Sequence, residues 1–317
     1  MFNLVVHQLK RTNPELLPTG MRTVDALRHP FVPSENKRDI LDLIWRKAGP
    51  EVLLSIGQGI QEIGYDPIWH AAVRSASPAV LFDKWQQFEV FAHSRNRLRI
   101  DQTSEKRATF RRYTVDDGTP TNPENLLICG MIIALLEEIG CRGLHCEMPV
   151  EDGTAHRIRE GGQFFVPDDI NALMTAAWTI EWRLFSPRTE NAISQSELPE
   201  IPLSQSCDAT LRTSIETMVR LLMLDVARQW KVGELAREAG LSTRSLQRRL
   251  RDAEFSFSQL VRLVRIHEAC RLLTDSDIPL TMIGFCAGFS DSAHFSRDFR
   301  ASMGMTPTDY RVVCQKI

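Results

Sequence analysis

The stretch from Thr281 to Arg311 constrains the fold of this chain more than any other. It reads T-M-I-G-F-C-A-G-F-S-D-S-A-H-F-S-R-D-F-R-A-S-M-G-M-T-P-T-D-Y-R. A short apolar segment is followed by Gly288 and by a second segment that Ser290 can cap through its hydroxyl group. In this second segment Phe295 and Phe299 are four residues apart, so they face the same side of a helix. The pattern predicts a helix-turn-helix.

The outward side of the second helix carries small, polar or cationic groups. They are Ser292, Ala293, His294, Ser296, Arg297 and Arg300. A helix that enters the major groove of DNA needs side chains of this kind. An ordinary helical hairpin with a solvated face explains this stretch equally well when the stretch is taken alone.

The order of residues also carries a family resemblance. The pattern Ile283, Gly288-Phe289-Ser290-Asp291, Phe295, Arg297, Phe299, Gly304, Thr306-Pro307 and Tyr310-Arg311 resembles the C-terminal signature of AraC/XylS-type transcription regulators. The resemblance covers the C-terminal third of the chain. It implies an all-α domain of two helix-turn-helix subdomains joined by a connector helix. Gly284 departs from the family pattern, which usually has alanine there, and glycine inside a helix costs up to about 1 kcal/mol relative to alanine.

The composition fits a protein of two domains with separate cores. The chain has 317 residues, of which 43% are hydrophobic and 25% charged. Its longest apolar run, 126–136, is far shorter than the roughly 20 residues of a membrane-spanning helix, and the N-terminus lacks the pattern of a signal peptide. Seven cysteines without paired spacing favour a reducing cytoplasm over a disulfide framework.

Positive charge is concentrated toward the C-terminus. Residues 212–317 hold 16 Lys+Arg against 12 Asp+Glu, a net charge of +4, although the whole chain has a net charge of −2. The remaining residues therefore carry a net charge of −6. This asymmetry favours a nucleic-acid partner for the C-terminal part, and the placement of the charges matters more than their sum.

The N-terminal portion mixes helical and strand signals, which predicts an α+β domain over 1–185. Helices are expected over 39–48, from Ser77 onward and from Asn122 to Gly140, with Ser77 and Asn122 as N-caps that a proline follows. Strands are expected over 97–101 and 178–184. The third helix is apolar nearly all round, so it is expected to be buried. Ahead of an AraC-type module, this portion resembles the arabinose-binding-type domain of the family, which implies effector binding and dimerisation.

Motifs for catalysis are absent from the sequence. Gly57-Gln-Gly59 lacks the third glycine of a dinucleotide loop, and neither a Gly-x-Ser-x-Gly elbow nor a His-Glu-x-x-His helix occurs. We therefore expect no catalytic residue, no cofactor and no resident metal. A metal or thiol sensor built from Cys141, His145 and Cys146 remains an alternative, although cysteines more often act as small apolar residues. A third hypothesis is an enzyme fused to a DNA-binding tail, but no catalytic motif in the sequence supports it.

A linker is expected over 186–210, where prolines and serines replace periodic apolar residues. The predicted DNA-binding domain, 211–317, contains an earlier helix-turn-helix with its turn at Gly240-Leu241. Its second helix is capped by Ser242 and anchored by Leu246 and Leu250. The side chains expected to contact DNA are Thr243, Arg244, Gln247, Arg248, Arg249 and Arg251. By resemblance, the positions that match DNA contacts of the family are Thr243, Arg244, Gln247 and Arg248. Arg249 and Arg251 are expected to contact phosphates.

A connector helix is predicted from the capping box Ser256-Gln259 to about Thr274. At about 1.5 Å per residue, its 19 residues span roughly 28 Å, close to the 34 Å of one turn of B-DNA. The helix can therefore set two recognition helices into successive major-groove segments.

Together these features predict a cytoplasmic, sequence-specific transcription regulator. We expect it to be an activator controlled by a small-molecule effector that binds the N-terminal domain. Its expected partners are double-stranded DNA, the effector, RNA polymerase and a second copy of the chain, with no membrane. The alternative is a redox- or metal-sensing regulator that uses Cys141, His145 and Cys146.

Overall fold

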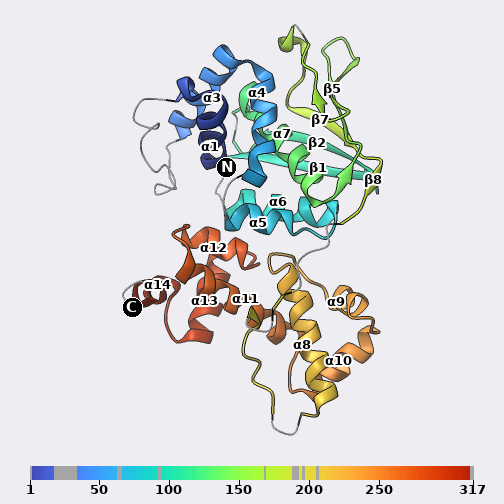
Figure 1. The fold of residues 1–317 in the computed structure, drawn as a ribbon, viewed down its shortest axis with the longest axis vertical. Coiled ribbons are helices and arrows are strands. Elements are labelled where there is room, and N and C mark those ends of the chain that lie inside the picture. The colour runs from blue at the N-terminus through green and yellow to red at the C-terminus, as the bar shows by residue number, and fades with distance from the viewer. Residues whose placement is uncertain are drawn as a thin grey trace. The chain divides into compact units, whose positions relative to one another are not determined.

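The chain folds into two compact units in the computed structural model (Figure 1). The first comprises Met1–Glu89 with His93–Arg188, and the second comprises Val90–Ala92 with Thr189–Ile317. The structure describes residues 2–17, 34–62, 66–91, 95–116, 118–167, 169–187, 193–194, 197–204 and 207–314. The predicted linker, 186–210, lies partly outside these residues. The first unit contains a β-sheet and the second is helical, as the sequence predicts.

Helices form the N-terminal part of the first unit. They are α1 (Phe2–Thr12), η1 (Pro14–Leu16), α3 (Ser34–Ala48), α4 (Pro50–Ser55), η3 (Ile56–Glu62), α5 (Pro67–Val73) and α6 (Pro78–Phe91). The predicted helix 39–48 is the C-terminal part of α3. The predicted cap at Ser77 is confirmed, because the Val80 amide donates a 3.3 Å hydrogen bond to its hydroxyl oxygen.

A six-stranded antiparallel sheet follows, in the order β1-β2-β7-β4-β5-β6. Its strands are β1 (Asn96–Ser104), β2 (Arg107–Thr114), β4 (His145–Pro149), β5 (Ala155–Glu160), β6 (Gln163–Phe164) and β7 (Ala177–Glu181). A second, two-stranded sheet pairs β3 (Cys141–Arg142) with β8 (Leu184–Phe185), and η4 (Ile170–Ala172) precedes β7.

One face of the large sheet is buried beneath helices. Leu98, Phe110 and Trp178 point to this face, and the Phe110 ring contacts Phe82 of α6 edge-on at 5.5 Å. The strand expected over 178–184 is too long. It ends at Glu181, and Leu184 belongs to the small sheet with 57% of its surface exposed, so it does not share the buried face.

The apolar helix α7 (Asn122–Ile139) is buried as predicted, with no exposed residue along its length. Its cap is Thr121 rather than Asn122, because the Thr121 hydroxyl oxygen accepts from the Glu124 amide while the Glu124 carboxylate accepts from the Thr121 amide. At Gly130 the helix meets α4 so closely that a Cβ atom would lie 2.1 Å from the Leu54 carbonyl oxygen. Glycine at this position therefore sets the distance between the two helices.

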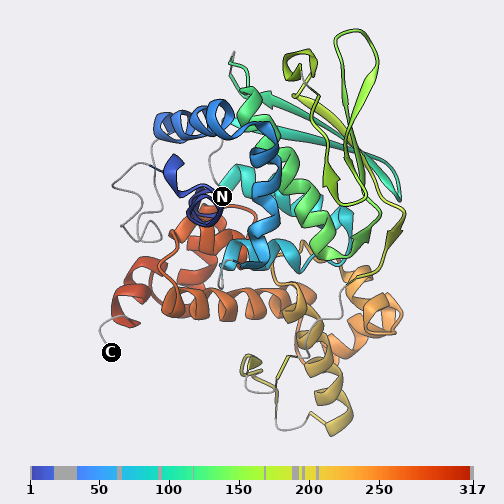
Figure 2. The ribbon, with the colours of Figure 1, turned by 45° about the horizontal axis from the view of Figure 1, so that its top comes forward.

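The described helices of the second unit are α8 (Ala209–Leu224), α9 (Val232–Glu238), α10 (Thr243–Asp252), α11 (Phe257–Asp275), α12 (Leu280–Cys286), α13 (Ser292–Met303) and α14 (Pro307–Cys314). The long helix α11 joins the pair α9–α10 to the pair α12–α13 (Figure 2). Its Ser256-Gln259 capping box is present as predicted. None of the helices that the structure describes is long and apolar enough to cross a membrane.

Candidate nucleic-acid interface

Helices α9 and α10 form the first helix pair. Gly240 adopts a φ of +67° in the turn between them, and the Leu241 amide donates to the Ala236 carbonyl oxygen at 2.8 Å. Ser242 caps α10 as predicted, because its hydroxyl oxygen accepts from the Ser245 amide at 3.1 Å. Leu246 and Leu250 are buried against the rest of the unit, which orients α10 with the opposite side toward solvent.

The outward side of α10 is a cationic face. Its exposed residues include Thr243, Arg244, Gln247, Arg248 and Arg251. Within the described chain, no ion pair joins Arg244, Arg248 or Arg251 to an acidic side chain. Like charges three or four residues apart destabilise a helix by about 0.2–0.5 kcal/mol per pair. An unpaired row of arginines is therefore better explained by an anionic partner than by helix stability.

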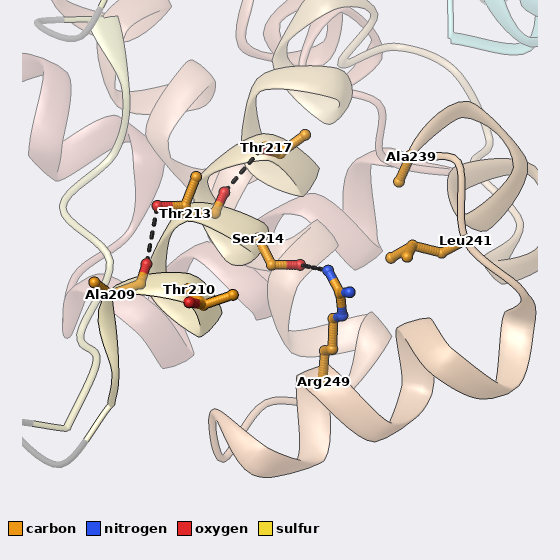
Figure 3. Close-up of a pocket in the computed structure, with 8 residues that line it drawn as sticks. All are labelled: Ala209, Thr210, Thr213, Ser214, Thr217, Ala239, Leu241 and Arg249. Atoms are coloured by element: carbon orange, nitrogen blue, oxygen red, sulfur yellow. Dashed lines mark hydrogen bonds between the residues drawn. The ribbon is translucent and has the colours of Figure 1, made fainter.

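Arg249 points away from this face, toward α8. Its Nη1 donates a 2.7 Å hydrogen bond to the Ser214 hydroxyl oxygen, the one hydrogen bond that its side chain makes to the described residues (Figure 3). Arg249 thus lies beside the base-reading candidates rather than among them. The predicted set therefore separates into an outward row and one inward residue.

A hollow of about 520 Å³ lies between α8 and the first helix pair, with Arg249 in its wall. Hydroxyl groups of α8 line most of the rest, from Thr210, Thr213, Ser214 and Thr217. No acidic side chain lines it. The hydroxyls of Thr213 and Thr217 donate back to carbonyl oxygens of α8, so Arg249, Ser214 and Thr210 supply the donors that remain.

The sequence does not distinguish these hydroxyls as functional residues. Their signal is a spacing of three, four and seven residues along one helix, which places Thr210, Thr213, Ser214 and Thr217 on one side of α8. Neighbouring apolar residues at the same helical spacing, such as Met218 and Leu222, give the stronger core signal. Only the contact with Arg249 distinguishes the hydroxyl side from an ordinary solvated face.

Helices α12 and α13 form the second helix pair, and its turn contains Gly288 at a φ of +80°. The predicted cap is wrong by one residue. Asp291 caps α13, because its Oδ1 accepts from the His294 amide at 2.7 Å, while the Ser290 hydroxyl donates to Asp291 Oδ2 at 3.0 Å. Both hydrogen bonds hold the pKa of Asp291 below its usual value, and the one from the His294 amide has the larger effect. The predicted inward residues Phe295 and Phe299 are both buried.

The outward side of α13 is less cationic than that of α10. Ala293, Ser296, Arg297 and Arg300 are exposed, whereas Ser292 and His294 are half-buried. The Ser296 hydroxyl donates to the Ser292 carbonyl oxygen at 2.9 Å. Arg297 and Arg300 form no ion pair with the described residues. These two arginines are therefore the cations of α13 that remain available to an anion.

His294 is more constrained than the sequence suggests. Its Nε2 lies 3.2 Å from the Asp298 carboxylate, its Nδ1 lies 3.0 Å from the Ser290 hydroxyl, and its ring meets Phe289 edge-on at 5.6 Å. Both ring nitrogens thus have partners on the protein. A base contact by this imidazole requires it to leave at least one of them.

The cysteine alternative gains no support from the geometry. Among the residues that the structure describes, no group of three or more His, Cys, Asp and Glu side chains is placed to share a metal ion. The Cys146 sulfur lies 3.8 Å from that of Cys129, and both are fully buried. Burial raises the pKa of Cys129 well above its usual value and that of Cys141 to about 12. Thiols in this state are poor nucleophiles at neutral pH.

The second unit is similar to part of several known proteins. A model described as a helix-turn-helix domain matches residues 235–312, which run from α9 into α14. The transcriptional activator FapR of Escherichia coli is 28% identical over 120 residues, 38% of this chain and 46% of the relative. The ornithine utilization regulator of Pseudomonas aeruginosa is 38% identical over 115 residues, 34% of this chain and 33% of the relative.

Among solved structures, a DNA-binding transcriptional dual regulator from Escherichia coli K-12 is 26% identical with a TM-score of 0.32, covering 36% of this chain and all of that one. This chain spans less than half the length of the two curated relatives. The family model covers the stretch whose residues carry the family signature, Thr281 to Arg311, and confirms the resemblance seen there. In its C-terminal third, the chain is similar to transcription regulators of the AraC/XylS type.

Proposed function

We propose that this protein is a sequence-specific, DNA-binding transcription regulator in which α10 and α13 each enter a major-groove segment. In this proposal both helix pairs are helix-turn-helix subdomains. The observation that carries it is the outward face of α10, where Arg244, Arg248 and Arg251 are exposed and without acidic partners in the described chain. DNA supplies the anionic partner that these arginines lack. The function is one of binding and not of catalysis.

We propose that the two recognition helices, α10 and α13, contribute unequally to DNA binding. Arginine can bind guanine through two hydrogen bonds, and glutamine can bind adenine in the same way, so Arg244, Gln247 and Arg248 are proposed to read bases. Thr243 and Arg251 lie on the same face, where they reach the edge of the groove. On α13, Arg297 and Arg300 are the cations, and Ser292, Ala293, His294 and Ser296 offer small or polar contacts. We expect α13 to contribute less affinity than α10.

Arg249 is proposed to bind a backbone phosphate in the hollow beside α8. Its guanidinium keeps donors free after the bond to Ser214, and hydroxyl groups rather than acids surround it. Phosphate contacts of this kind fix the position of a protein on the duplex without reading its sequence. Arg249 therefore contributes to affinity for all sequences, in contrast with Arg248.

The connector helix supports a two-segment reader. The 19 residues of α11 span roughly 28 Å at about 1.5 Å per residue, which approaches one turn of B-DNA. Two successive groove segments on one side of the duplex therefore lie within reach of one chain, and a dimer would read two such sites.

The first unit is proposed to bind a small-molecule effector and to dimerise, which would make the protein an activator that recruits RNA polymerase in the cytoplasm. This part rests on the family resemblance and on the separate core of the first unit. A hollow of about 220 Å³ next to Arg38 and Arg95 is smaller than most ligand sites, which occupy about 300–1,000 Å³. Both arginines are paired with acids, so this hollow does not carry the effector proposal.

The test is a selection of duplexes from a randomised DNA library with the full chain, followed by fluorescence-anisotropy titration of the selected duplex. Wild-type protein is expected to enrich a bipartite sequence, with an affinity at least about 1,000-fold above that for random DNA. The variant Arg248→Ala tests the α10 face. Arg111→Ala is its matched control, since it removes an exposed arginine of the first unit. Enrichment of no sequence would contradict the proposed function.

A further inference from the structure

The turn between α12 and α13 packs against the corner that leads from α8 to α9. We define the turn as Gly288–Phe289 and the corner as Asp225–Trp230. A Cβ atom on Gly288 would lie 2.2 Å from the Val226 carbonyl oxygen, far inside contact distance. Gly288 also has a φ of +80°, a conformation that favours glycine. The two helix pairs therefore meet backbone to backbone at this point.

Gln229 joins the same two segments through its side chain. Its Nε2 donates a 2.9 Å hydrogen bond to the Gly288 carbonyl oxygen. Its Oε1 accepts a 3.2 Å hydrogen bond from Nη2 of Arg265, which lies on α11. One amide group thus connects the corner, the turn and the connector helix.

Arg265 occupies a costly position for a charged side chain. Burial lowers its pKa to about 10, and its Nε is buried without a hydrogen-bond partner among the described residues. The guanidinium lies 5.9 Å from the centre of the Phe289 ring. An arginine in solvent would not lose its hydration. The buried position of Arg265 is therefore better explained by its contacts with Gln229 of the corner and Phe289 of the turn.

Each side of this contact is fixed to its own helix pair. In the corner, Arg228 pairs with Glu238 of α9 at 2.7 Å and lies 4.1 Å above the Trp230 ring. In the turn, the Phe289 amide donates to the Gly284 carbonyl oxygen at 2.9 Å, and its ring packs on Phe295 of α13 at 5.1 Å. Displacing the turn from the corner therefore means displacing one helix pair relative to the other.

We propose that this contact is a spacing lock, in which Gln229 and Arg265 act as positioning residues that fix the distance and angle between α10 and α13. If α11 were the single connection, each helix pair could rotate about one end of α11. The contact between the turn and the corner is a second connection, and it prevents this rotation. The inference rests on the proposed function, because the lock determines which separation of the two groove segments the protein accepts.

The consequence concerns DNA in which the two segments are moved apart. One added base pair rotates the second segment by about 35° and shifts it by about 3.4 Å, since one turn holds 10–10.5 base pairs over about 34–36 Å. If the separation of α10 and α13 is fixed, the protein cannot adjust to this change and loses the DNA contacts of one of the two helices. If the contact is broken, the two helix pairs can move to fit the altered DNA, and less affinity is lost.

The test measures the affinity of the full chain for the selected duplex and for versions with one base pair added or removed between the two segments. Gln229→Leu and Arg265→Met each remove the hydrogen bond between these residues. Arg262→Met is the matched control, because it removes an exposed arginine from the same helix. Wild type and control are expected to lose about 10- to 100-fold on the altered spacings, the worth of one or two base contacts. The two lock variants are expected to lose about threefold or less, a difference within about 0.7 kcal/mol. An unchanged loss in both lock variants would overturn the proposal.

A second measurement needs no DNA. Spin labels introduced by bioorthogonal chemistry at Asp252 and Ser302, both exposed, report the distance between the ends of α10 and α13 in the full chain. Wild type is expected to give one narrow distance distribution, and the lock variants a distribution at least about twice as wide. Equal widths would overturn the lock. If no duplex is ever selected, the proposed function fails, while this measurement still decides whether the lock exists.

Discussion

The Nη1 atom of Arg249 on α10 donates a 2.7 Å hydrogen bond to the hydroxyl oxygen of Ser214 on α8. This bond holds the guanidinium at the side of α10, where we propose that a phosphate reaches it. Arg249→Ala is therefore expected to weaken binding equally for specific and random DNA, and to reduce the slope of log K against log salt by about 1. Anisotropy titrations over a range of salt concentrations measure both quantities. A loss confined to the selected duplex would instead make Arg249 a base-reading residue.

Arg248 is exposed at the centre of the outward face of α10, so its loss has a different signature. Arg248→Ala is expected to cost about 1–3 kcal/mol on the selected duplex and to relax the preference at one base pair. Repeating the library selection with the variant measures this relaxation. Arg111→Ala should leave both quantities unchanged, and a variant profile identical to wild type would remove Arg248 from the set of base contacts.

The cap of α13 predicts a pH dependence of stability. The pKa of Asp291 is depressed in the folded protein, mainly because its carboxylate accepts a hydrogen bond from the His294 amide. A depressed pKa contributes stability above the unfolded value, about 3.9, and this stability is lost as pH falls through the folded value. Asp291→Asn keeps a capping oxygen but cannot titrate. Its Tm should therefore fall less than that of wild type between pH 5 and pH 3, as measured by calorimetry. If the Tm of wild type and of the variant fell by the same amount between pH 5 and pH 3, Asp291 would not be the source of the pH dependence.

Gly130 predicts a large effect on the stability of the first unit. A methyl group there would lie 2.1 Å from the Leu54 carbonyl oxygen, so α7 and α4 must separate to admit it. Gly130→Ala is expected to destabilise the unit by at least about 1–3 kcal/mol, the usual range for overpacking. Urea unfolding of the full chain measures this change. Gly118→Ala is the control, because its nearest neighbour would be an exposed Asp116 oxygen at 3.4 Å.

The buried thiols predict resistance to alkylation. Cys129, Cys141 and Cys146 are fully buried, and burial raises the pKa of Cys141 to about 12. In the native protein, iodoacetamide at pH 8 is expected to modify the half-buried Cys207 while these three remain unmodified, as intact-mass and peptide spectra would show. Rapid modification of Cys146 would restore the redox-sensing alternative.

Local signals in the sequence were sufficient for helices α9 to α13 of the second unit. Leu246, Leu250, Phe295 and Phe299 repeat at helical spacing, and all four are buried where the pattern predicts. The cap of α13 was missed because Ser290 and Asp291 are both good capping residues. The choice between them depends on the path of the chain after Gly288, which a one-dimensional pattern does not contain.

The direction of Arg249 required the tertiary structure. Its position on α10 alone places it near the edge of the outward face, and only the approach of Ser214 on α8 turns it inward. In the first unit, α4 and the two-residue strands β3 and β6 are too short to show a period, so the sequence did not predict them. The length of the strand near Trp178 was overestimated because alternation continues past Glu181 into the small sheet.

The central residues of helix α7, 125–136, are all buried. A molecule in solution therefore cannot reach these central residues until the surrounding core has opened. For an effector that contacts them, the rate of association would be set by that opening and would level off as effector concentration rises. Such saturation in a stopped-flow experiment would distinguish entry into the core from binding at the surface, where the rate keeps increasing with concentration.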